Sequence, residues 1–317
     1  MHARGLNPIL VRAALVVACV LGAAAGASPA VGLPESELQV FAGGKWVTWW
    51  ASARAPSSWP APDPTVLRAI AWRPAASGME WAELELGGTG EAWRLQVVLA
   101  RLDPSRLRME LVEASSEAGT LAEWSLDALP ANAVLGVNAG QFTGGQPWGW
   151  LVRRGQVEQP PGPGRVSMAF CVLPDGRVRF VPVTEIPSSG SGPAAEAFQS
   201  YPVLLWGDGE VPEQLTRAGL GVDLTHRDAR LSVGELRDGR IVLALTRFAA
   251  AGDALGSLPF GPTVPEMAAI LGAIGCRHAM MLDGGISAQL ALTDASGARR
   301  AWRGWRKVPL ALVAYPR

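Results

Sequence analysis

The stretch TVPEMAAILGAIGCRHAMMLDGGISAQL (residues 263–290) decides the fold of this chain. A Thr-Val-Pro-Glu start at Thr263 and a glycine at Gly275 predict a capped helix between them. The apolar run at 277–282 predicts a buried strand that stops at Asp283 and two glycines. A carboxylate in that place either caps a local turn or lies at the mouth of a pocket. The rest of the sequence decides between these interpretations.

Strands dominate the predicted structure. Alternating or apolar segments predict strands at 81–88, 93–103, 106–115 and 133–140, and hairpins at 148–157 and 230–248. A short helix is expected over 121–130 and a surface loop over 186–198. We therefore predict a single α+β domain over 80–317, built on a mixed, largely antiparallel β-sheet with a few packing helices.

Residues 28–79 are predicted to be a loop-rich lead-in to this domain. Their segment WVTWWASARAPSSWPAPDP (46–64) is dense in Trp, Pro and Ser and has no clean period. Its Trp side chains either pack on the domain or form a sugar-stacking surface, and packing is the favoured interpretation.

The N-terminus has the layout of a secretory signal peptide over residues 1–27. Two arginines precede an apolar stretch, and Ala25-Gly26-Ala27 offers a small-residue cleavage site near Ala27. The apolar stretch is shorter than the ~20 residues that span a bilayer. Export to the periplasm or the exterior is therefore expected, with no transmembrane span after cleavage. A lipoprotein anchored at Cys19 is an alternative, although the apolar run continues past that cysteine.

The composition excludes several classes of partner. The 317 residues include 28 Lys plus Arg and 28 Asp plus Glu, and the basic residues look scattered. Nothing in this pattern predicts nucleic-acid binding or a polybasic membrane contact. Beyond the predicted signal peptide, Cys171 and Cys276 either form one disulfide or are buried thiols. No cofactor motif and no metal-binding cluster is visible.

Two glycine-rich turns follow predicted buried strands, VNAGQFTGGQPWG (137–149) and MLDGGISAQL (281–290). Asn or Asp followed by glycines places a polar group at the end of a strand and lets a ligand approach the backbone. Neither turn has the ending of a P-loop or the spacing of a dinucleotide-binding loop. Each alone is a weak indication of a site.

Together, five segments resemble the phosphodiester glycosidase family in the family's order. They are VLGVNAGQFTGGQPWGWLVRRGQV (134–157), YPVLLWGDGEV (201–211), DARLSVGELRDGRIVLAL (228–245), TVPEMAAILGAIGCRHAMMLDGGISAQL (263–290) and RKVPLALVAYP (306–316). The resemblance covers about residues 80–317. It implies hydrolysis of a glycosidic bond to phosphate in an envelope or extracellular glycan, with a carbohydrate or phosphosugar polymer as substrate.

The resemblance, set beside the chemistry, gives candidate site residues. Asp283 is the candidate catalytic carboxylate, Arg230 a candidate phosphate clamp, and Asn138 binds sugar hydroxyls or orients the carboxylate. The structural alternatives are a turn cap for Asp283, an ion pair with Asp223 or Asp228 for Arg230, and a capping role for Asn138. The predicted substrate-binding residues are Gly140, Gly149, His226, Gly284, Gly285 and Ser287. His278 is expected to be structural.

The sequence departs from the family pattern at Gln141 and Thr143 in the first turn and at Ile286, where the pattern has glycine. It also reads RLSVG at 230–234, where the pattern has RTAIG. These departures leave a second interpretation open, in which the chain is a non-catalytic envelope protein that binds a polysaccharide or a phosphosugar.

Overall fold

The computed structural model describes residues 35–76, 78–113, 123–164, 166–190, 192–249, 258 and 260–317. These residues belong to one compact unit that spans 32–317. The expected signal peptide, with Cys19 and the cleavage site near Ala27, lies outside the described residues. The fold is predominantly β, with 44% strand and 13% helix, so the predicted α+β class fits only loosely. None of the helices described is long and apolar enough to cross a membrane.

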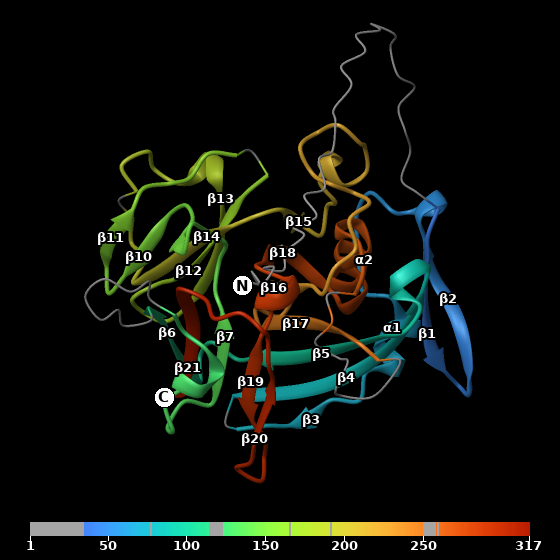
Figure 1. The fold of residues 1–317 in the computed structure, drawn as a ribbon, viewed down its shortest axis with the longest axis horizontal. Helices are drawn as coiled ribbons and strands as arrows, with labels where there is room; N and C mark the ends of the chain where they lie inside the picture. Colours follow the sequence, from blue (N-terminus) through green and yellow to red (C-terminus); the bar gives the residue numbers. More distant parts are fainter. Residues whose placement is uncertain are drawn as a thin grey trace, which may run out of the picture. The chain divides into compact units, whose positions relative to one another are not determined.

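Three larger sheets and one small hairpin make up the fold (Figure 1). The nine-stranded sheet has the order β15-β18-β16-β17-β5-β4-β1-β2, with β3 also paired to β4. Its strands are β1 (Glu37–Ala42), β2 (Lys45–Ala51), β3 (Arg73–Pro74), β4 (Met79–Gly88), β5 (Leu95–Leu102), β15 (Val203–Leu205), β16 (Leu231–Leu236), β17 (Ile241–Phe248) and β18 (Cys276–Leu282).

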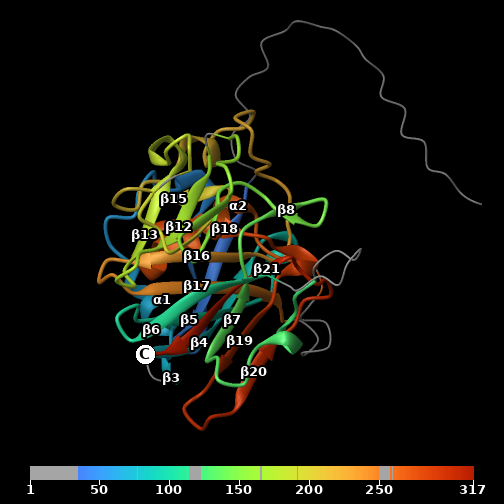
Figure 2. The same ribbon diagram turned by 90° about the vertical axis from the view of Figure 1, so that its left-hand side faces the viewer.

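One five-stranded sheet has the order β11-β10-β14-β12-β13, and the other has the order β20-β19-β7-β21-β6. The first consists of β10 (Leu151–Arg153), β11 (Gln156–Gln159), β12 (Met168–Val172), β13 (Val178–Pro182) and β14 (Glu196–Ser200). The second consists of β6 (Leu107–Glu113), β7 (Leu135–Asn138), β19 (Leu290–Thr293), β20 (Arg299–Trp302) and β21 (Leu310–Pro316). Figure 2 shows β7, β19 and β21 side by side. A small hairpin joins β8 (Phe142–Thr143) to β9 (Gln146–Pro147).

The central strands of the nine-stranded sheet are buried on both faces, and their side chains alternate between two cores. In β18, Met280 and Leu282 point into a core shared with the two five-stranded sheets. Ala279 and Met281 point into a second core, beneath α1 (Pro64–Ala69) and α2 (Val264–Ile274). The described strand pairs are all antiparallel, so the predicted largely antiparallel pairing is confirmed and no mixed sheet is formed by these strands.

Helix α2 has the predicted boundaries. The Thr263 side chain accepts a hydrogen bond from the Glu266 N–H, the Glu266 carboxylate accepts one from the Thr263 N–H, and Gly275 ends the helix at φ 104°. Every residue of the helix is buried, and β18 begins directly after Gly275.

Residues 28–79 are not loop-rich where the structure describes them. They contain β1, β2, β3 and α1, and β1 pairs with β4 of the predicted domain. Strand β1 alternates only over a few residues, with Leu38 and Val40 buried, and most residues of β2 are at least partly exposed, so the period that would have indicated strands is weak. As expected, Trp50 and Trp59 pack inside, at 5% and 8% exposure.

Two other local predictions need correction. The segment 186–198, predicted as a surface loop, ends in the buried strand β14, which begins at Glu196. The helix predicted over 121–130 is a single 3-10 turn, Leu126–Ala128, and residues 121–122 lie outside the described residues.

Cys171 and Cys276 are free, buried thiols, so the disulfide alternative does not hold. Burial raises the pKa of the Cys171 thiol to about 12.

Candidate active site

The candidate site lies where strand β16 begins and the adjacent antiparallel strand β18 ends. Leu231 opens β16 and pairs with Leu282, the last residue of β18. The residues just outside this pair, Arg230 and Asp283, therefore leave the sheet together. Asp283 has the predicted position: it follows the last residue of the buried strand β18 and precedes the glycine turn.

Asn138 holds the backbone on both sides of the Asp283 turn. It ends β7 and is 1% exposed. Its Nδ2 donates to the Asp283 carbonyl at 2.9 Å, and its Oδ1 accepts from the Gln289 N–H at 3.0 Å. The Asp283 N–H donates to the Gly140 carbonyl at 2.9 Å. Asn138 and Gly140 thus fix the carboxylate in place through its main chain.

A second carboxylate, Asp228, lies against the same turn. The Gly285 N–H donates to the Ala229 carbonyl at 2.7 Å, which joins the two loops. A Cβ built on Gly285, at φ 57°, would lie 2.8 Å from Asp228 Oδ2, so only glycine allows this approach. Gly284 packs as closely, because a Cβ there would lie 2.6 Å from the Ala229 carbonyl oxygen.

Both carboxyl groups have raised pKa values. Burial raises the pKa of Asp283, and the charge of Asp228 raises it further, while a hydrogen bond from Ser287 and the charge of Arg306 oppose the shift. Burial likewise raises the pKa of Asp228, against the effects of Arg230, the Ala229 N–H and His226. Two neighbouring carboxyls with raised pKa values are typical of sites that move protons.

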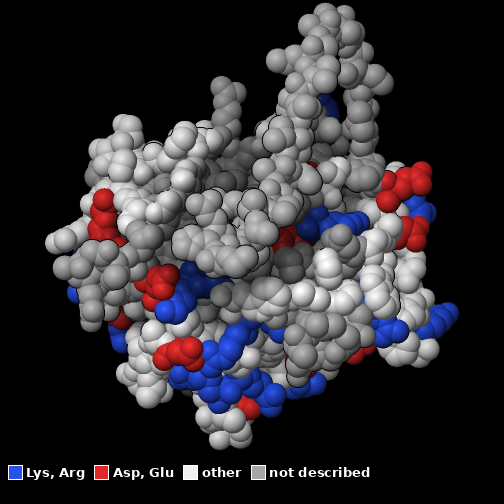
Figure 3. All heavy atoms as spheres, in the orientation of Figure 1, with Lys and Arg blue, Asp and Glu red and all other residues white. Residues whose placement is uncertain are grey.

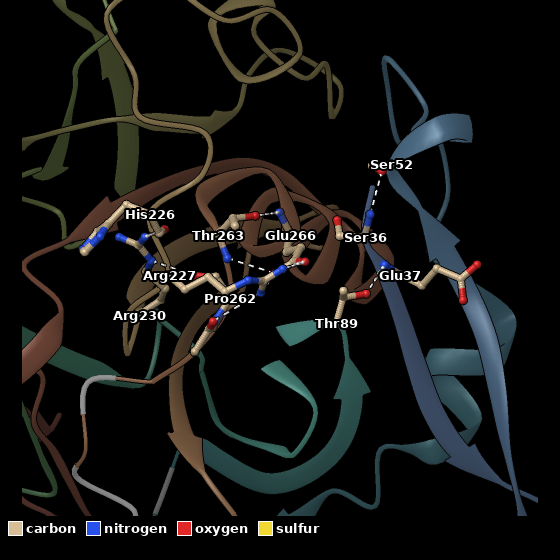
Figure 4. A network of polar contacts seen from close by, with 11 residues as sticks. Ser36, Glu37, Ser52, Thr89, His226, Arg227, Arg230, Pro262, Thr263 and Glu266 are labelled. Atoms are coloured by element: carbon tan, nitrogen blue, oxygen red, sulfur yellow. Dashed lines mark hydrogen bonds and ion pairs between the residues drawn. The ribbon is translucent and has the colours of Figure 1, made fainter. Parts of the chain in front are cut away.

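Arg230 holds loops together rather than facing a carboxylate (Figure 4). Its Nε donates to the Pro262 carbonyl at 3.0 Å, and its Nη2 donates to the His226 carbonyl at 2.5 Å. The ion pairs expected as its structural alternative are not formed with Asp223 or Asp228 within 4.0 Å. Burial lowers the pKa of Arg230.

Arg227 anchors the Asp228 loop to α2. Its guanidinium donates to both carboxylate oxygens of Glu266, at 2.7 and 2.8 Å, and Glu266 is fully buried (Figure 4). His226 is exposed, and its Nε2 lies 3.6 Å from Asp228 Oδ2, so it borders the second carboxylate.

The remaining predicted residues divide between the site and the scaffold. Ser287 is 3% exposed and hydrogen bonds to Asp283. Ile286, in the Asp283 turn, is 42% exposed, so its side chain faces solvent. Gly149 instead packs against the buried amide of Gln199, which holds the main chain at Trp150. His278 Nδ1 lies at hydrogen-bond distance from Glu235 Oε2, 2.9 Å, which is the structural role expected for this histidine.

A groove of about 600 Å³ borders the candidate site. Trp148 and Tyr201 form an edge-to-face pair in its wall, with ring centroids 4.9 Å apart. The Tyr201 carbonyl accepts from Gln141 Nε2, next to Gly140, which ties the groove to the Asp283 turn. Its lining, in the described part of the chain, is neutral: Trp148, Pro163, Gly164, Val166, Ser167, Tyr201, Pro202, Gln214, Leu220, Gly221 and Val222.

The sequence prediction missed the role of two residues. Asp228 was considered only as an ion-pair partner, although it precedes β16 as Asp283 follows β18, and antiparallel pairing brings those ends together. Arg306 was not singled out. It precedes β21, whose Ala311 pairs with Asn138, so the pairing of β7 and β21 would have placed it nearby. Within the described residues no group of three His, Cys, Asp or Glu could hold a metal ion.

Comparison with known families identifies the class. A sequence model of the phosphodiester glycosidase family matches residues 131–315, more than half of the chain. The chain therefore belongs to the phosphodiester glycosidase family. Comparison with curated protein sequences gives no match.

Three solved structures are similar. The catalytic domain of zebrafish N-acetylglucosamine-1-phosphodiester alpha-N-acetylglucosaminidase, auto-inhibited by its pro-peptide, has TM-score 0.53 and 17% identity over 90% of this chain and 89% of that one. A putative exported protein from Burkholderia pseudomallei has TM-score 0.51 and 15% identity over 70% and 74%. A hypothetical protein from Synechocystis has TM-score 0.49 and 16% identity over 84% of this chain and 65% of that one. The first two have the same fold as this chain.

Proposed function

We propose that the chain is an exported hydrolase that cleaves the glycosidic bond to phosphate in a sugar-1-phosphodiester of an envelope or extracellular glycan. Membership of the phosphodiester glycosidase family supports the reaction class. The observation that carries the proposal is the pair formed by Asp228 and Asp283 at one turn. Glycosidases in general act through two carboxyl groups.

The coupling of the pair fits this chemistry. The charge of Asp228 opposes the ionisation of Asp283, which favours a state with one carboxyl ionised and the other protonated. The ionised group activates a water or attacks C1 of the sugar. The C1–O bond then breaks, and its electron pair stays on the phosphate oxygen. Phosphate is a good leaving group, so little proton donation is needed.

Solvent labelling tests which bond is broken. The mature chain, residues 28–317, is incubated in ¹⁸O-water with sugar-1-phosphodiesters, and both products are examined by mass spectrometry. The proposal predicts ¹⁸O in the free sugar and none in the phosphomonoester. Label in the phosphate would instead indicate a phosphodiesterase that attacks phosphorus.

Export is proposed from the layout of residues 1–27. Expression of the full chain with its own leader, followed by N-terminal sequencing of the released protein, tests this. The proposal predicts a mature end at Ser28, whereas retention of an acylated Cys19 would indicate the lipoprotein alternative.

Binding without catalysis is the second candidate function, and the neutral, aromatic groove that Tyr201 and Gln141 link to the Gly140 loop favours it. Aromatic side chains in a neutral groove suit the faces of sugar rings. If the wild-type protein cleaves no phosphodiester but retains an immobilised glycan, and Trp148→Ala releases it, this second function replaces the first.

A further inference from the structure

The arginine that the sequence assigned to phosphate, Arg230, is already occupied. Two of its guanidinium nitrogens bind main-chain carbonyls of Pro262 and His226. Those bonds hold the Asp228 loop against the start of α2. Arg230 is therefore a positioning residue for Asp228, and the phosphate needs another cation.

Arg306 lies directly on the Asp283 turn. Its N–H and that of Trp305 both donate to the Ile286 carbonyl, at 2.9 and 2.7 Å. Gly304 allows this approach, because a Cβ there would lie 2.8 Å from the Ile286 carbonyl oxygen. The Arg306 guanidinium lies over the Phe142 ring, 5.0 Å from its centroid, and its charge acts on Asp283.

Arg306 differs from its basic neighbours in the segment 299–307. The sequence suggested scattered charges, but basic atoms gather over the region of β7, β19 and β20 (Figure 3). The neighbours have partners: Arg299 binds carbonyls, Arg300 pairs with Asp294, Arg303 with Asp127 and Lys307 with Glu123.

No carboxylate in the described part of the chain lies within 4.0 Å of Arg306. Its side chain is exposed and rests on an aromatic face, which leaves the donor edge open to a ligand.

We propose that Arg306 and the Asp283 turn form a phosphate-binding subsite, and that its ligand is the phosphate of a sugar 1-phosphate ester. This rests on the proposed function. A phosphodiester carries one negative charge, and the planar guanidinium donates to two of its oxygens at once.

The subsite would also favour the reaction. Water oxygen bonds to C1, the C1–O bond breaks, its electron pair stays on the phosphate oxygen, and one proton of the water passes to the carboxylate pair. The phosphate therefore gains negative charge beside Arg306 as the bond breaks. An interaction that strengthens in this way stabilises the transition state more than the bound substrate.

Binding is the first test, with inorganic phosphate and glucose 1-phosphate as probes in titration calorimetry. We expect the wild type and the control Arg303→Gln to bind both, and Arg306→Gln to bind them about 10- to 100-fold more weakly. Arg306→Lys, which keeps the charge but loses the fork, should lie between. Equal binding by Arg306→Gln and the wild type, or no phosphate binding by the wild type, would overturn the proposal.

A comparison of leaving groups is the second test. On a sugar-1-phosphodiester, Arg306→Gln should lower kcat/KM about 10- to 100-fold. On the 4-nitrophenyl glycoside of the same sugar, whose leaving group is not a phosphate, it should change little. Equal losses on both substrates would mean a structural role. If the wild type cleaves neither, the proposed function fails, while the binding test still decides the role of Arg306.

Discussion

Asp283 and Asp228 place two ionisable groups where water has limited access, and this has a cost in stability. Burial raises both pKa values, so ionisation is opposed in the folded state. Each carboxyl contributes its full stabilisation below the pKa that it has in the unfolded chain. This contribution is lost as the pH rises through the pKa that the same carboxyl has in the folded protein. Sites of this kind commonly trade stability for activity.

Asp283→Asn should therefore gain stability relative to the wild type as the pH rises from 4 to 8, because ionisation of the Asp283 carboxyl is opposed in the folded protein. Urea denaturation at both pH values measures the difference. A variant that gains no stability relative to the wild type over this range would contradict the pKa direction.

Asn138, the last residue of β7, holds the Asp283 turn through two hydrogen bonds. Asn138→Ala leaves the Asp283 carbonyl and the Gln289 N–H without partners, at a cost of about 1–3 kcal/mol for each buried group. Thermal and urea denaturation should show this loss together with reduced activity. Exposed Asn132→Ala is the control and should leave stability within ~0.5 kcal/mol. Full stability and activity in Asn138→Ala would rule out the positioning role.

At the scale of elements, the site depends on how α2 holds the loop before β16. Glu266 is fully buried, completes the capping box of α2 and binds Arg227 with both oxygens. Glu266→Ala would leave Arg227 partly buried without its counter-charge, and should cost about 3–5 kcal/mol. The exposed pair of Glu213 and Arg217 gives the control, since Glu213→Ala should cost less than ~1 kcal/mol. Equal effects of the two substitutions would contradict this account.

Elements whose signals are local could be predicted from the sequence. The cap at Thr263, the glycine at Gly275 and the hairpin turn at Asp238-Gly239 each act within a few residues, and each is where it was expected. Strand β1 was missed because its alternation of Leu38 and Val40 with polar neighbours is short, and β2 was missed because most of its residues are at least partly exposed. Strand β1 takes its place by pairing with β4, about 50 residues along the chain, and β2 pairs with β1.

The residues of the candidate site likewise divide into those with a local sequence signal and those placed by strand pairing. Asp283 was predictable because a strand, an acid and two glycines are adjacent in the sequence. Asp228 and Arg306 reach the site only through the pairings of β16 with β18 and of β7 with β21. Those pairings join residues far apart in the chain, which a single sequence does not indicate.

At the scale of the whole molecule, three sheets share one core, and the two thiols lie in different sheets. Cys171 is in β12 and Cys276 in β18, and both are free and buried. We expect no reaction of the folded mature chain with a thiol reagent at pH 8, because burial raises both thiol pKa values.

In denaturant without reductant, both thiols of the mature chain should react. Colorimetric thiol titration checks both conditions. No titratable thiol in the unfolded protein would indicate a disulfide and would contradict the structure.

The central claim is that Asp228 and Asp283 act together to cleave a sugar-1-phosphodiester. The most direct measurement is kcat/KM of Asp228→Asn and Asp283→Asn on that substrate, with Asp175→Asn, in an exposed hairpin turn, as control. The account predicts a loss of about 10²- to 10⁴-fold in each of the two site variants, and an unchanged control. Activity within a few-fold of the wild type in either site variant would contradict it.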